Sequence, residues 1–135
     1  MVDDATAAYI VENQKCFEDL KQVASQLAGL LVLAAAGSKE AVPDHPALLA
    51  ARELFREAVP GARPTERALP HHTHLLRASA AIGTALHEAN RGLNVDRILV
   101  PLRAGYAELE RAARALPGFE MVSYERACCG LRQAQ

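Results

Sequence analysis

Apolar residues recur at intervals of three and four from residue 4 to residue 36, and this spacing constrains the fold more than any other feature. One face of an α-helix repeats with that period, so the pattern predicts a helix over 4–36. Asp3 and Asp4 favour its start, because acidic side chains cap free amides and stabilise the positive end of the helix dipole. Gly37 favours its end. The apolar face comprises Tyr9, Ile10, Cys16, Phe17, Leu20, Val23, Ala24, Leu27, Leu30, Leu31 and Ala34.

The same period predicts three further helices, over residues 46–59, 70–91 and 95–116. With no Trp, three Tyr and three Phe in 135 residues, Ala and Leu must fill the core, and small side chains suit closely packed helices. Four helices with fairly short connections tend to run alternately up and down. We therefore expect an all-α chain with one domain over 1–135, a four-helix up-and-down antiparallel bundle with an irregular C-terminal tail over 117–135.

The second half of the first helix, LAGLLVLAAAG, is apolar on every side. A helix that is hydrophobic all round is usually buried all round, and a four-helix monomer seldom covers one helix completely. We therefore expect a homodimer whose contact is made by Leu27, Leu30, Leu31 and Leu33. The alternative is a central helix that its own chain covers.

Titratable side chains gather at one end if the helices run up and down. His71 and His74 lie one turn apart at the start of the third helix, and Glu12 and Cys16 lie near the start of the first. Imidazole, thiolate and carboxylate groups are the usual zinc ligands, so these four residues are a candidate metal site. The spacing PHHTH matches no known ligand motif, and histidines in a first helical turn are usually solvated. Cys16 also fits the role of a small core residue.

Cys128 and Cys129 are adjacent and precede Gly130. Such a pair could serve as a redox dithiol or a soft-metal clamp, because the thiolate is the reactive form. A disulfide ring between neighbouring residues is strained, however, so two ordinary thiols are the alternative reading. Three cysteines do not form a secreted disulfide framework, and the acidic first residues do not resemble a secretory signal, so we expect a cytoplasmic protein.

Several classes of function are disfavoured by what the chain lacks. A net charge of −1 without a clustered basic face argues against nucleic-acid binding. The longest apolar run, residues 27–37, is too short to span a bilayer as a helix. No GxSxG, HExxH, GxxxxGK[ST] or GxGxxG motif occurs.

The residues name no cofactor and no reaction. The leading hypothesis is a non-enzymatic helical-bundle homodimer that binds another protein or a small apolar ligand. The competing hypothesis is a metal- or thiol-dependent bundle that uses the His and Cys residues at one end.

Overall fold

Four helices make up the computed structural model, which describes residues 2–37, 44–61 and 63–121. They are α1 (Asp4–Ala35), α2 (Pro46–Glu57), α3 (Leu69–Arg91) and α4 (Val95–Ala115), and no strand occurs among the described residues. Each helix begins and ends within two residues of its predicted bounds. The all-α prediction is confirmed, and no helix in the described ranges is long and apolar enough to cross a membrane.

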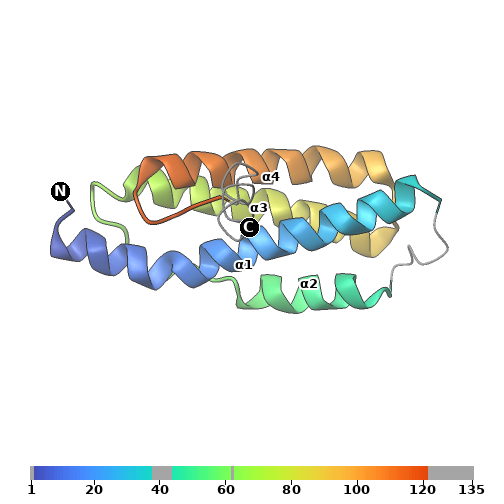
Figure 1. Ribbon diagram of the computed structural model, residues 1–135, viewed down its shortest axis with the longest axis horizontal. Coiled ribbons are helices and arrows are strands. Elements are labelled where there is room, and N and C mark those ends of the chain that lie inside the picture. The colour runs from blue at the N-terminus through green and yellow to red at the C-terminus, as the bar shows by residue number, and fades with distance from the viewer. Residues whose placement is uncertain (1, 38–43, 62, 122–135) are drawn as a thin grey trace, which may run out of the picture.

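The helices alternate in direction along the bundle. Figure 1 shows α2 running back beside α1, α3 returning in the direction of α1, and α4 running back again. This confirms the up-and-down order expected from the short connections.

Local sequence signals account for most of the helix boundaries. The Asp3 carboxylate accepts a hydrogen bond from the Thr6 amide at 2.7 Å, and the Asn94 side chain accepts one from the Arg97 amide. His45 caps α2, with Pro46 in its first turn. These side chains pair amides that have no partner inside the helix.

Helix α1 contacts all three other helices, which explains its apolar second half. The large side chains Leu27, Leu30 and Leu31 point inward and are at most 6% exposed. The positions that face solvent are Ala28, Gly29, Val32, Ala35 and Ala36, which are small apart from Val32. The run therefore places large side chains on its buried face and mostly small ones on its exposed face. Other parts of the same chain cover Leu27, Leu30 and Leu31.

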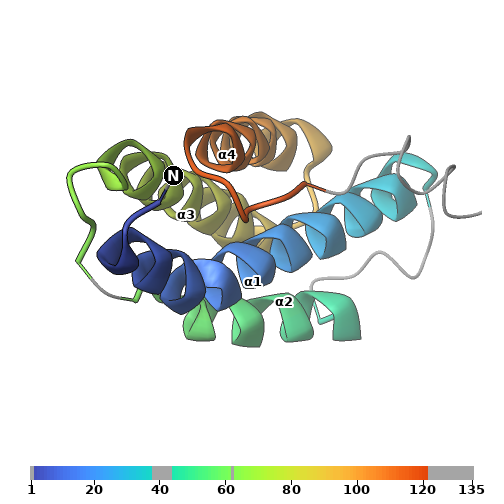
Figure 2. The same ribbon diagram turned by 60° about the vertical axis from the view of Figure 1, so that its left-hand side comes forward.

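Helices α3 and α4 pack against each other most extensively. Their close approach depends on Gly105, because a Cβ there would lie 2.6 Å from the Cγ1 atom of Ile82. Helices α1 and α4 are instead bridged at one end by residues 116–121, which turn back after α4 and pass between the two helices (Figure 2). Phe119 in this segment is 3% exposed and packs edge-on against Phe17.

Candidate functional site

The starts of α1 and α3 and the end of α4 lie at one end of the bundle, as the predicted order requires (Figure 1). The Tyr9 hydroxyl oxygen lies 2.7 Å from Nδ1 of His71 and 3.2 Å from Nδ1 of His72. His71 is completely buried, and its ring centroid lies 3.9 Å from that of Phe119. The structure thus joins α1, α3 and residues 116–121 through one histidine.

Two proton arrangements satisfy both hydrogen bonds of the Tyr9 hydroxyl, which can donate one and accept one. In the first, His71 donates to Tyr9 and Tyr9 donates to His72. In the second, the two donors are reversed, and Nε2 of His71 becomes a buried N–H without a partner among the described residues. The first arrangement leaves only a lone pair on Nε2 of His71. We assign this arrangement, because buried N–H groups without partners are rare.

Burial sets the charge state of this cluster. It lowers the pKa of His71 to about 4, with a further contribution from the charges of His72 and His74. It also raises the pKa of Tyr9 far above its ordinary value of 10. Both side chains are therefore neutral near pH 7, and the hydrogen bond between Tyr9 and His71 joins α1 to α3 without a charge on either group.

His74 belongs to a separate surface group. Its Nδ1 atom lies 2.7 Å from Oε2 of Glu108 on α4, and Arg111 donates to the other carboxylate oxygen at 2.8 Å. Burial alone would raise the pKa of Glu108, but the hydrogen bond from His74 and the charge of Arg111 outweigh it and lower that pKa. This group fastens α3 to α4.

The structure does not bring the four predicted metal ligands together. His71 bonds to Tyr9, His74 bonds to Glu108, Cys16 is buried in the core and Glu12 is exposed. Burial raises the pKa of the Cys16 thiol to about 11, as expected for a thiol that serves in packing. No group of three or more His, Cys, Asp or Glu residues among those described could hold a metal ion. Cys128 and Cys129 lie outside the described residues.

The four leucines predicted to join two subunits are largely engaged inside one chain. Leu27, Leu30 and Leu31 are buried, and Leu33 is partly buried. Leu27, Leu30 and Leu31 therefore pack within one chain, whereas Leu33 keeps part of its surface outside the bundle. One side of this half of α1, at Ala28, Gly29, Val32 and Ala35, stays exposed, so the chain covers the helix only in part and the homodimer stays a prediction.

An open groove runs between α1 and α4, beyond the point where residues 116–121 end. We call it the α1–α4 groove, and it has a volume of about 710 Å³. Its apolar lining comes from both helices and from the last described residue: Ala24, Ala28, Leu99, Leu102, Tyr106, Ala107 and Met121.

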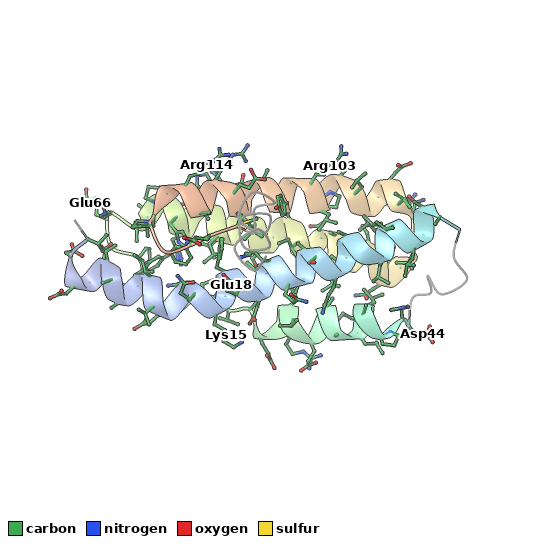
Figure 3. The ribbon with its side chains drawn as sticks, viewed as in Figure 1. Lys15, Glu18, Asp44, Glu66, Arg103 and Arg114 are labelled. Carbon is green, nitrogen blue, oxygen red and sulfur yellow. The ribbon has the colours of Figure 1, made fainter. Side chains whose placement is uncertain are left out.

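Charged side chains border the groove. Glu18 and Lys21 stand on α1, and Arg103 and Glu110 stand on α4. Figure 3 shows Arg103 extending outward from α4, so it borders the groove rather than filling it. Lys21 links α1 to residues 116–121 here, because its amino group donates to the Glu18 carboxylate and, at 2.6 Å, to the Glu120 carbonyl.

Sequence reasoning missed this groove. Its residues carry no motif, and the helical period predicts Ala24 only as a position on the apolar face of the first helix. The sequence signal for the groove is the row of small residues along α1. Their side chains have little volume, so they do not fill the space between α1 and α4.

Comparisons with models of known protein families, with curated proteins and with solved structures find no match to this chain. Its function is therefore inferred from its own geometry.

Proposed function

We propose that this protein is a non-enzymatic, cytoplasmic adaptor that binds one amphipathic helix of a partner protein in the α1–α4 groove. The observation that carries the proposal is the groove itself, an open apolar channel between two antiparallel helices with charges along its borders. A helix laid into a hydrophobic groove is a recurring mode of peptide recognition.

The openness of the groove favours a helix over a small apolar ligand. Gln22, Ser25 and Ala28 line it and are exposed, so an occupant keeps one side in contact with solvent. Small-ligand sites usually enclose most of the ligand surface. An amphipathic helix suits this groove better, because only one of its faces needs to leave water.

The dimensions of the groove define the partner. Helix α1 rises about 15 Å between Glu18 and Ala28, which matches two to three turns of a bound helix. The alanines at 24, 28 and 107 allow a third backbone to approach closely, as helices packed at the usual distance of about 8–10 Å require. We expect apolar residues at positions i, i+3, i+4 and i+7, flanked by charges of both signs.

A selection from a library of helical peptides displayed on phage tests the proposal, with the full chain as bait. The selected peptides should share that apolar spacing. The Ala28→Arg substitution places a long charged side chain in the groove and should weaken their binding about tenfold or more, since one buried charge costs more than 1.4 kcal/mol.

Ala50→Arg is the matched control, because Ala50 is an exposed alanine on α2 away from the groove. It should leave peptide binding unchanged. Peptides that bind the Ala28→Arg protein as tightly as the native chain would contradict the proposal, as would a selection that enriches no helical pattern.

A further inference from the structure

The charged side chains along the α1–α4 groove differ in whether they have an ion-pair partner. Glu18 pairs with Lys21 at 3.2 Å, and Glu110 pairs with Arg114 at 3.6 Å. Arg103 also borders the groove, but it forms no hydrogen bond or ion pair with any residue that the structure describes. Within the described chain, its guanidinium is therefore the charge of the groove that has no counter-charge.

Arg103 stands apart from the acidic residues of the groove. It precedes Glu110 by seven residues, so the two side chains leave the same face of α4 about 10 Å apart along the helix axis. Because α1 and α4 run in opposite directions, Glu18 lies near the Glu110 end of the groove, and Figure 3 shows it far along the bundle from Arg103. The groove thus has one end with paired charges and a second region with one unpaired positive charge.

Neutral hydrogen-bonding groups accompany Arg103 in this region. Tyr106 follows it by three residues on α4 and is 43% exposed, and its hydroxyl has no partner among the described residues. Ser25 on α1 follows Glu18 by seven residues, so it lies in the same region, and it too is exposed. Both hydroxyls can donate a hydrogen bond, and a guanidinium can only donate. These groups suit an acceptor that carries negative charge.

We propose that Arg103 selects partner helices that carry an Asp or Glu side chain level with it at the edge of the groove. A carboxylate accepts two parallel N–H groups from one guanidinium, which fixes both its position and its orientation. The inference rests on the groove being the helix-binding site, and it names which charge of the partner that site recognises. A basic residue of the partner gains less at the other end, because Glu18 and Glu110 are already paired.

The expected size of the effect follows from the exposure of Arg103. An ion pair in contact with water contributes modestly to binding, so Arg103→Gln should weaken binding of an acidic peptide about twofold to fivefold. Arg103→Glu also adds repulsion and should weaken it about tenfold. Arg103→Lys keeps the charge and should recover most of the binding. Because Arg103 is exposed, these variants should fold, which circular dichroism checks through their helix content.

The selection of displayed helical peptides is repeated with the Arg103→Glu chain as bait. Peptides selected on the native chain should share an acidic residue at one fixed position beside their apolar face. Peptides selected on Arg103→Glu should carry Lys or Arg at that position. Arg77→Glu is the matched control, because Arg77 is an exposed arginine on α3 that does not line the groove, and the change in net charge is the same. It should select the same acidic residue as the native chain.

Fluorescence anisotropy then compares one selected peptide with a version in which lysine replaces the acidic residue. The native chain should bind the acidic version about tenfold more tightly, and Arg103→Glu should prefer the lysine version. Both preferences should shrink between 0.1 M and 1 M NaCl, because the screening length falls from about 10 Å to about 3 Å.

The inference and the proposed function fail in different ways. Selected peptides with the apolar spacing that bind the native chain and Arg103→Glu equally well would leave the adaptor function intact and overturn the role of Arg103. An equal loss of binding in Arg77→Glu would overturn it as well, since net charge rather than Arg103 would then decide. A selection that enriches no helical pattern contradicts the adaptor function and this inference with it.

Discussion

His71 concentrates several roles in one side chain. It is buried, bonds to Tyr9 on α1, and stacks on Phe119, whose segment leads to the groove. A histidine in the first turn of a helix was expected to be solvated or to bind metal. Its burial follows from residues 116–121 folding back over it, which a local sequence pattern does not encode.

The buried state of His71 makes stability depend on pH. Its pKa falls from 6.5 to about 4 on folding, so the unfolded chain binds a proton between these values that the folded chain does not. The free energy of unfolding is therefore fully maintained above pH 6.5 and falls as the pH drops toward 4. This site alone should cost about 2 kcal/mol between pH 7 and pH 5.

Urea unfolding of His71→Gln at both pH values checks this prediction, since glutamine cannot take up the proton. The difference between pH 7 and pH 5 should shrink by about 2 kcal/mol relative to the native chain. His87→Gln changes an exposed histidine and should leave the difference as it is. An unchanged difference in His71→Gln would show that His71 is not buried as a neutral group.

Two glycines within helices allow the effect of packing on stability to be measured apart from the effect of helix propensity. Gly105 lies where α4 crosses α3, and a Cβ there would meet Ile82 at 2.6 Å. Gly29 lies on the exposed side of α1, where a Cβ would meet nothing within 4 Å. Alanine gains helix propensity at both positions, but only one position has space for it.

Gly105→Ala should lower the free energy of unfolding by about 1–3 kcal/mol, because overpacking forces α3 and α4 apart. Gly29→Ala should raise it by up to about 1 kcal/mol. Urea unfolding of both variants measures the contrast. A stabilised Gly105→Ala protein would mean that α3 and α4 do not approach as closely as described.

Homodimerisation concerns the whole molecule and stays a prediction from the sequence. With Leu27, Leu30 and Leu31 inside the bundle, the exposed large apolar residue on this half of α1 is Val32, which is 69% exposed, and Leu33 is partly buried. We therefore expect a dimer through this half of the helix to use Val32, Leu33 and their small neighbours.

Sedimentation velocity at tens of micromolar protein tests the prediction. The native chain should sediment as a dimer, and Val32→Arg should convert it to a monomer by placing a charge in the contact. Val11→Arg is the control, because Val11 is equally exposed on the first half of α1. A single 14.5 kDa species for the native chain would contradict the dimer.

The sequence alone determined the helices and their order, because each helix follows from local periodicity, capping residues and prolines, and short connections leave few ways to arrange four rods. It also placed the starts of α1 and α3 at one end, where Tyr9 meets His71. Tertiary structure decided the rest. The leucines of α1 turn inward, the predicted metal ligands separate, and the groove opens, because rotation about a helix axis and the separation of α1 from α4 depend on contacts between residues far apart in the chain.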